Sequence, residues 1–177
     1  MKILALDLAT ATGVAVGDTS DRPWCHTERL SDAGASHGAR FGACMLATKK
    51  LVRQHEPDVI ALEQAVATVM QGSPTRLHVA LGLRASVLAM ADYFGLRVEE
   101  YAVSTVRKHF IGHGKMKGKD AKAAVIARCN QLGWIVANDN EADAAAVWDY
   151  ARAVLDRKFT PTPNGLFDER ADTGAGS

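Results

Sequence analysis

The stretch KILALDLATATGVAV, residues 2–16, is the part of the chain around which the rest is arranged. It predicts a buried hairpin with one carboxylate at the end of its first strand. Residues 3–6 form an apolar run without alternation, which is typical of a central strand covered on both faces. Asp7 interrupts this run at its end, and small residues up to Gly13 lead into a second apolar run, residues 14–16. A buried carboxylate without a partner is costly, so Asp7 is predicted to have a cationic partner and to anchor the active site. An aspartate that only caps a turn is the alternative.

A second short apolar run, residues 59–62, ends in Glu63. A glutamate directly after four apolar residues is unfavourable within a plain strand. It suits the carboxyl edge of a sheet, where α/β proteins bind their ligands. A solvated loop acid is the alternative. The segment that follows, residues 65–74, is predicted to be a mobile loop beside this site.

The remaining elements are predicted from hydrophobic spacing and helix breakers. Apolar residues over 41–52, with Met45 among them, fall on one face at helical spacing and predict a helix that Pro57 ends. A helix over residues 77–94 is apolar around much of its circumference, so it is predicted to pack on two sides and to form a subunit interface. Strands are predicted over 24–30 and, at the sheet edge, over 96–101.

With 177 residues, of which 47% are apolar, the chain is long enough for one substantial core. One domain is predicted over residues 1–158, followed by a disordered tail over residues 159–177 that is rich in proline and glycine. The formal net charge is only +1, so the protein is no polycation. A surface for nucleic acid therefore requires local clustering of its cations.

The three cysteines, Cys25, Cys44 and Cys129, are an odd and widely spaced set without a CxxC pattern. This spacing argues against a disulfide framework and against a zinc site, so we expect reduced thiols that fill the core. The first residues lack a signal-peptide pattern, and no stretch approaches the length of a membrane span. The sequence therefore predicts a cytoplasmic protein.

Basic residues cluster in residues 106–122, VRKHFIGHGKMKGKDAK, which three glycines interrupt. A flexible basic loop of this kind can bind phosphates through its cations and its backbone N–H groups. A solubilising loop is the alternative, because runs of charge usually face solvent. A helix is predicted to follow over residues 120–132. The cations predicted to contact DNA are Arg107, Lys108, Lys115, Lys117, Lys119 and Lys122.

The segment NDNEADAAAVWDY, residues 138–150, begins with residues that favour a helix start. Asn138 or Asn140 can cap the helix, and Glu141 or Asp143 falls in its first turn, where an acid stabilises it. Asp143 lies among alanines, which predicts that it points inward. Capping explains one acid here, but it explains Asp139, Glu141 and Asp143 together less well.

Two strand-end acids and one helix-start acid, Asp7, Glu63 and Asp143, form a set of oxygen ligands without histidine or cysteine. Hard oxygen ligands select Mg²⁺ or Mn²⁺ rather than zinc. Two such ions about 4 Å apart can activate an attacking water and stabilise the leaving oxygen. With lysines nearby to hold phosphates, this is the chemistry of a phosphodiesterase.

Four motifs in order, DLATATGVAV, ALEQ, GHGKMKGKDAKAAV and DNEADAAA, resemble the landmarks of RuvC-type Holliday junction resolvases over most of the chain. The resemblance implies the ribonuclease H-like fold, an α/β fold with a five-stranded mixed sheet flanked by helices. It also implies an Mg²⁺-dependent endonuclease that nicks branched DNA as a homodimer with two active sites.

The resemblance also assigns roles to single residues. Lys119 matches a basic position and is predicted to act on the scissile phosphate, with Lys122 in reserve. Arg107 matches a second basic position that contacts phosphate. The matching metal carboxylates are Asp7, Glu63 and Asp143.

The chain departs from the family at two positions. The family usually has an acid or a histidine three residues before the last aspartate, where this chain has Asn140. Asp139 or Glu141 can substitute, or Asn140 can ligate through its carbonyl oxygen, so the fourth ligand stays open among these three. The family often places an aromatic residue three positions after the strand-end glutamate, where it can stack on a base, and this chain has Val66 there. A different cleavage preference and other branched substrates are therefore plausible.

Two other functions fit parts of the pattern. Actin-like kinases and ATPases also begin with a strand-end aspartate and a glycine-containing hairpin, but they need a second phosphate-binding hairpin that this chain does not repeat. A branched-DNA-binding protein without catalytic activity is the other alternative, and retention of all three carboxylates argues against it. A magnesium titration of junction cleavage separates the three functions.

Overall fold

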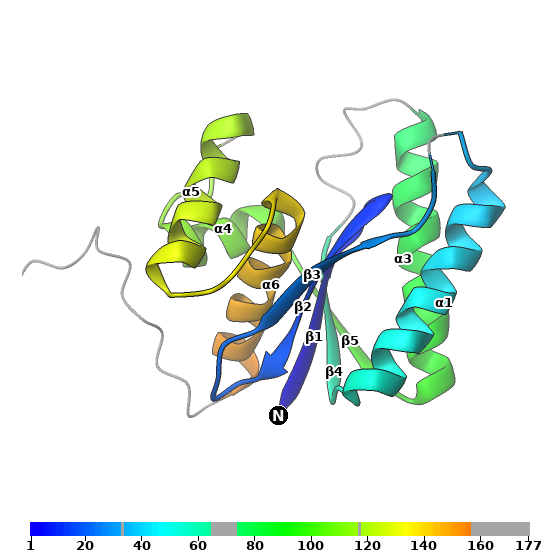
Figure 1. Ribbon diagram of the computed structural model, residues 1–177, viewed down its shortest axis with the longest axis horizontal. Helices are drawn as coiled ribbons and strands as arrows, with labels where there is room; N and C mark the ends of the chain where they lie inside the picture. The colour runs from blue at the N-terminus through cyan, green and yellow to red at the C-terminus, as the bar shows by residue number, and fades with distance from the viewer. Residues whose placement is uncertain (33, 65–73, 117, 157–177) are drawn as a thin grey trace, which may run out of the picture.

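A single sheet with helices on both faces forms the protein, as Figure 1 shows for the computed structural model. The structure describes residues 1–32, 34–64, 74–116 and 118–156. The five strands lie in the order β3-β2-β1-β4-β5. They are β1 (Lys2–Asp7), β2 (Ala11–Asp18), β3 (Trp24–Arg29), β4 (Val59–Glu63) and β5 (Arg97–Tyr101).

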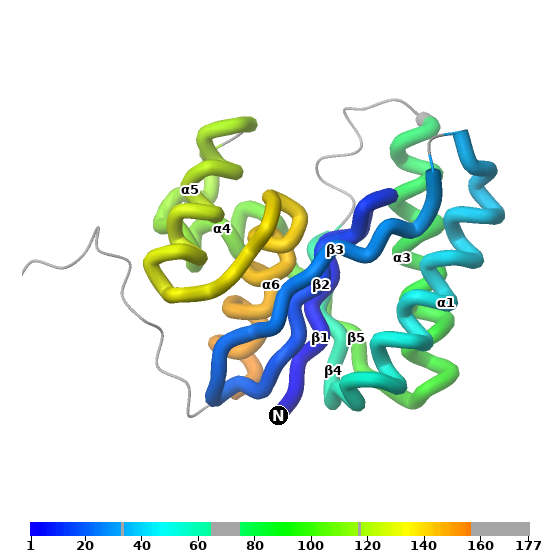
Figure 2. Tube along the Cα trace, viewed as in Figure 1, coloured from blue at the N-terminus to red at the C-terminus, as the bar shows by residue number. Residues whose placement is uncertain are grey.

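Helices cover both faces of the sheet (Figure 1). On one face lie α1 (His37–His55) and α3 (Pro74–Phe94). On the other lie α4 (Val103–Ile111), α5 (Gly118–Gln131) and α6 (Asp139–Leu155). Figure 2 follows the chain from its blue start in β1 to the orange α6, which packs against β1 and β2 at the centre of the sheet.

The apolar run of β1 belongs to two cores, which explains why it does not alternate with polar residues. Ile3 and Ala5 lie in the cluster under α4, α5 and α6. Leu4 and Leu6 lie in the cluster under α1 and α3. All four side chains are at most 1% exposed. The prediction of a central strand covered on both faces is confirmed.

The direction of the strands brings two predicted site residues together. β1 is antiparallel to β2 and parallel to β4, and β4 is parallel to β5. Leu6 lies opposite Leu62 in the register of β1 and β4, so Asp7 and Glu63 end neighbouring strands at the same edge. The mixed five-stranded sheet flanked by helices is confirmed, with β5 at an edge as predicted.

The prediction of a basic loop over residues 106–122 is wrong. α4 continues to Ile111, and α5 begins at Gly118, two residues before its predicted start, so only a short link separates two helices. The segment is helical because its apolar residues belong to the core under the sheet. These residues are Val106, Phe110, Ile111, Ala121 and Val125.

The other predicted elements agree with the structure, with small shifts at their ends. α1 contains the predicted helix and begins at His37, where the hydroxyl of Ser36 accepts a hydrogen bond from Ala39 N at 3.2 Å. Met45, which was expected on the buried face of this helix, is 39% exposed. The cysteines are free thiols, as expected, and Cys44 and Cys129 are buried.

α3 contradicts the expectation that no stretch is long enough to cross a membrane. Thr75–Phe94 satisfies the length and hydropathy of a membrane span. A single helix of this kind is weak evidence, because core helices of globular domains satisfy the same test. Leu83, Val87 and Ala91 are buried in the cluster that α3 shares with α1 and the sheet, so α3 is part of the globular domain.

Some predictions concern residues outside the described ranges. They are the loop over residues 65–73, Val66, Lys117 and the tail over residues 159–177. Pro74, the last residue of the predicted loop, is described and begins α3, so the loop prediction is wrong at this residue.

Candidate active site

Three carboxylates lie at the edge of the sheet where β1 and β4 end. Asp7 and Glu63 are the last residues of these strands, and Asp143 lies near the start of α6. The charges of Asp7 and Asp143 both raise the pKa of Glu63. The charge of Asp143 likewise raises the pKa of Asp7. The three carboxylates are therefore electrostatically coupled at this edge of the sheet.

Burial is the main cause of the raised pKa values of these carboxylates, and repulsion from neighbouring acids adds to it. Burial raises the pKa of Asp7 to about 7 and that of Glu63 to about 8. It also raises the pKa of Asp143. Within the described residues, no hydrogen bond or ion pair satisfies any of the three side chains, so Asp7 is not a turn cap. A bound cation would stabilise their ionised forms.

α6 reaches this edge because Gly13 leaves room for its first turn. Gly13 lies opposite Asp7 in the β1–β2 hairpin. A Cβ atom at position 13 would lie 1.9 Å from the backbone oxygen of Asn140, which is far shorter than any real contact. The missing side chain therefore lets the start of α6 approach the end of β1, and Asp143 comes with it.

The start of α6 is fastened to β3 by Glu141. Asn138 caps the helix by accepting a hydrogen bond from Glu141 N at 3.0 Å. One carboxylate oxygen of Glu141 accepts from the hydroxyl of Thr27 at 2.9 Å, and the other accepts from Ala137 N at 2.7 Å. Glu141 is only 6% exposed. Both of its oxygens thus accept hydrogen bonds, one from β3 and one from the link before α6, which removes Glu141 from the candidates for a fourth ligand.

Asp139 and Asn140 are the two fourth-ligand candidates that remain. Asp139 is paired with Lys122, which lowers the pKa of this carboxyl. Its charge in turn raises the pKa of Asp7, so it borders the site. Asn140 is partly buried in the first turn of α6, and its backbone oxygen lies against Gly13.

Two cations, Lys122 and Arg107, stabilise the ionised forms of the carboxylates and so lower their pKa values. Lys122 and Arg107 both lower the pKa of Asp7, and Arg107 also lowers that of Glu63. Arg107 is partly buried, and its Nη1 donates to the carbonyl of Met116 at 3.5 Å. Its Nε is buried without a hydrogen-bond partner in the described residues. Arg107 therefore retains donor capacity beside the acids.

Lys122, rather than Lys119, is the lysine that the structure brings to the carboxylates. Lys119 is exposed in the first turn of α5 and contributes to the pKa of none of the three acids. The sequence contained a signal for this difference. Buried residues at helical spacing, Ala121 and Val125, mark the inner face of α5, and Lys122 borders that face while Lys119 lies away from it.

The described residues include no group of three or more acidic, histidine or cysteine side chains that could hold a metal ion as it stands. Yet the charges of Asp7 and Asp143 raise the pKa of Glu63, and the charge of Asp143 raises the pKa of Asp7. Acids that repel one another are expected to stand apart until a cation lies between them. Their oxygen donors suit a hard divalent cation.

Residues 31–148 match the family model for "Crossover junction endodeoxyribonuclease RuvC". This match spans more than half of the chain. The chain belongs to the RuvC family. RuvC proteins are metal-dependent nucleases, so the actin-like kinase alternative is wrong.

Two relatives named crossover junction endodeoxyribonuclease RuvC are similar over most of their length. The protein of Koribacter versatilis is 28% identical over 155 residues, which cover 83% of this chain and 89% of the relative. The protein of Paraburkholderia phytofirmans is 27% identical over 147 residues, which cover 81% of this chain and 79% of the relative. The resemblance noted in the four sequence motifs is thereby confirmed.

Solved structures confirm the ribonuclease H-like fold class. Thermus thermophilus RuvC superposes with a TM-score of 0.64 at 22% identity, covering 87% of this chain and 97% of the other. The same protein in complex with a Holliday junction substrate superposes with a TM-score of 0.64 at 23% identity, covering 87% of this chain and 96% of the other. The yeast mitochondrial Holliday junction resolvase superposes with a TM-score of 0.54 at 12% identity, covering 82% of this chain and 75% of the resolvase.

Proposed function

We propose that this RuvC-family chain nicks four-way junctions or related branched DNA at the site formed by Asp7, Glu63 and Asp143. The observation that carries the proposal is the coupling of three carboxylates without partners at one edge of the sheet. The junction complex of Thermus thermophilus RuvC supports the choice of substrate. Bound Mg²⁺ or Mn²⁺ ions would supply an activated water and charge stabilisation for the leaving oxygen.

The protein's own residues divide the remaining work. Asp7, Glu63 and Asp143 would hold the metal, with Asn140 or Asp139 as a further oxygen ligand. Arg107 and Lys122 would bind the oxygens of the scissile phosphate, because they are the cations that act on these acids. Lys122 would exchange its partner Asp139 for a phosphate oxygen when DNA binds. The other predicted DNA contacts are Lys108, Lys115, Lys117 and Lys119.

Cleavage of a labelled four-way junction in a magnesium titration tests this function. We expect nicks only when Mg²⁺ or Mn²⁺ is added, with no cutting in EDTA and far slower cutting of a linear duplex of the same sequence. Cleavage at full rate in EDTA would contradict the metal site. Tight junction binding without cleavage at any metal concentration would instead support the alternative of a non-catalytic binding protein.

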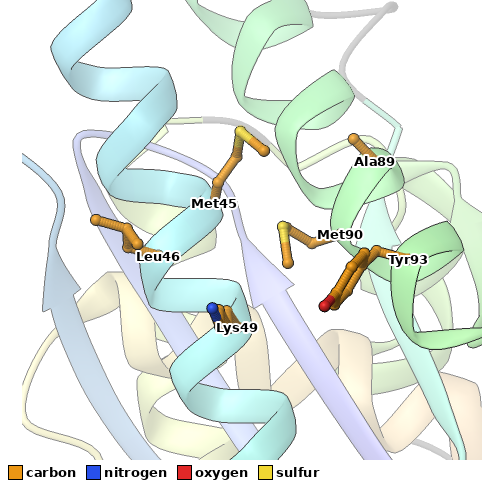
Figure 3. A pocket seen from close by; sticks show the side chains of 6 residues that line it. All are labelled: Met45, Leu46, Lys49, Ala89, Met90 and Tyr93. Carbon is orange, nitrogen blue, oxygen red and sulfur yellow. The ribbon is translucent and has the colours of Figure 1, made fainter.

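We also propose that the chain works as a homodimer through the outer surface of α1 and α3. Figure 3 shows an apolar hollow between these helices, with a volume of about 420 Å³. Leu46 of α1 is 68% exposed and Tyr93 of α3 is 70% exposed, so none of the residues that the structure describes covers this apolar surface. Paired nicks need two active sites related by a two-fold axis, which a symmetric interface supplies. The lining residues are Met45, Leu46, Lys49, Ala89, Met90 and Tyr93.

A charge placed on this surface should separate the subunits. The parent protein is expected at twice its chain mass of 18.9 kDa in light scattering, and Leu46→Glu is expected near the chain mass itself. The matched control is Ile135→Glu, because Ile135 is 81% exposed in the link between α5 and α6, away from the α1–α3 surface. A monomeric parent protein with full activity would rule out the dimer.

A cytoplasmic location remains part of the proposal. The three cysteines are free thiols, which is typical of a reducing compartment.

A further inference from the structure

A second group of cations surrounds a hollow on α4, apart from the pair that acts on the carboxylates. The hollow has a volume of about 920 Å³ and lies between the start of α4 and the link to α5. Two hydroxyls, two lysines and one histidine face it. Its lining residues are Ser104, Thr105, Lys108, Gly112, His113, Gly114, Lys115 and Met116.

Two glycines fold the link back over α4 and so form the hollow. Gly112 ends α4 with a positive φ of 76°, and its N–H donates to the carbonyl of Lys108 at 3.1 Å. Gly114 passes close to the first turn of α4, where a Cβ atom would lie 2.6 Å from the backbone oxygen of Ser104. The carbonyl of Met116 then accepts from Arg107. The link is thus fixed to α4 at several points.

The charge around this hollow is positive and uncompensated. None of its lining residues is acidic. Among the described residues, Lys108, His113 and Lys115 make no ion pair, and all three side chains are exposed. Some cations elsewhere in the described residues are paired with an acid, as Lys122 is with Asp139 and Arg84 is with Glu100. In a chain of net charge +1, this is a local site for an anion.

We propose that this hollow binds a backbone phosphate of DNA other than the scissile one. Lysine, histidine and hydroxyl groups all donate hydrogen bonds, and phosphate oxygens accept them. Arg107 and Lys108 are neighbours on α4, but their side chains differ in role. Arg107 is partly buried and acts on Glu63, whereas Lys108 is exposed and lines the hollow. The hollow therefore anchors DNA beside the cleavage site. This inference rests on the proposed function.

The test compares three variants in an Asp7→Asn background, where a fluorescent four-way junction is bound without being cut. Lys108→Ala with Lys115→Ala removes two cations from the hollow. We expect about a tenfold or greater loss of affinity, and a log-log salt slope smaller in magnitude by about 1.8, at roughly 0.9 for each phosphate contact. The control pair is Arg22→Ala with Arg53→Ala, which makes the same change in net charge at exposed positions near the opposite edge of the sheet.

Thr105→Glu distinguishes loss of binding from loss of folding. Thr105 lies in the first turn of α4, where an acid stabilises the helix start. This variant should therefore keep the melting temperature of the parent protein and still lose affinity for the junction, because it places a carboxylate among the lysines.

With Asp7 restored, single-turnover cleavage at saturating protein separates the two cation groups. Lys122→Ala should reduce the rate more than the affinity, since Lys122 acts beside the acids. The hollow variants should reduce the affinity more than the rate. Affinity and salt slope equal to those of the Arg22 and Arg53 control pair would overturn the inference. The binding measurement needs no cleavage, so failure of the proposed nuclease activity would be seen separately.

Discussion

Replacing Asp7 by Asn should reduce cleavage of a four-way junction by about a thousandfold or more, because the site loses a metal ligand without losing a cation that binds DNA. Asn has nearly the same shape as Asp, so the β1–β2 hairpin should stay intact. Junction affinity in the absence of cutting should therefore change little. Single-turnover cleavage and fluorescence anisotropy measure the two effects independently.

The same substitution should stabilise the metal-free protein at neutral and higher pH. Burial raises the pKa of Asp7 from 3.8 to about 7, so between these values the folded state binds more protons than the unfolded state. The stability of the parent protein therefore falls as the pH rises from about 4 to about 7. The Asn variant carries no charge to desolvate. In EDTA at pH 8 it should melt a few degrees higher, and the gap should narrow toward pH 5.

Asp92→Asn is the matched control, because Asp92 is an exposed acid near the end of α3. It should alter neither cleavage nor the dependence of the melting temperature on pH. An Asp7→Asn protein that cuts at the parent rate in Mg²⁺ would remove Asp7 from the site.

Gly13→Ala is the second change with a large expected effect. The added Cβ atom would lie 1.9 Å from the backbone oxygen of Asn140, so the start of α6 must move away from β2. Overpacking against backbone should cost about 3 kcal/mol, which corresponds to roughly 10 °C in melting temperature for a chain of this length. Asp143 moves with α6, so cleavage should fall by about a hundredfold or more even where the variant remains folded.

Gly42→Ala is the control for this substitution. Gly42 lies in the middle of α1, and a Cβ atom there meets nothing within 4 Å. Alanine should stabilise the helix by about 0.5–1 kcal/mol and leave cleavage unchanged. If Gly13→Ala melts and cuts as Gly42→Ala does, the close approach of α6 to β2 does not position the site.

Local patterns were sufficient for the parts of the fold that depend on neighbouring residues. The unbroken apolar run before Asp7 requires cover on both faces, and two helical layers provide it. An asparagine cap at residue 138 or 140 was predictable because capping involves only the adjacent turn, and Asn138 is the one that makes the bond. The glycines in the basic segment, residues 106–122, predicted a flexible loop, but two of them lie at the ends of helices. Gly112 ends one helix, and Gly118 begins the next.

The residue types of the site, three strand-end or helix-start acids and a basic segment, followed from the sequence alone. The choice among similar side chains depended on contacts between distant segments. Glu141 is engaged by Thr27, which lies 114 residues away along the chain, and so it was separable from Asp143 only in the folded protein. Lys122 and Lys119 have the same chemistry, and the orientation of α5 on the domain decides which one meets Asp7. Charge and hydrophobicity are properties of single residues and short stretches, whereas the direction in which a side chain points depends on how whole helices pack.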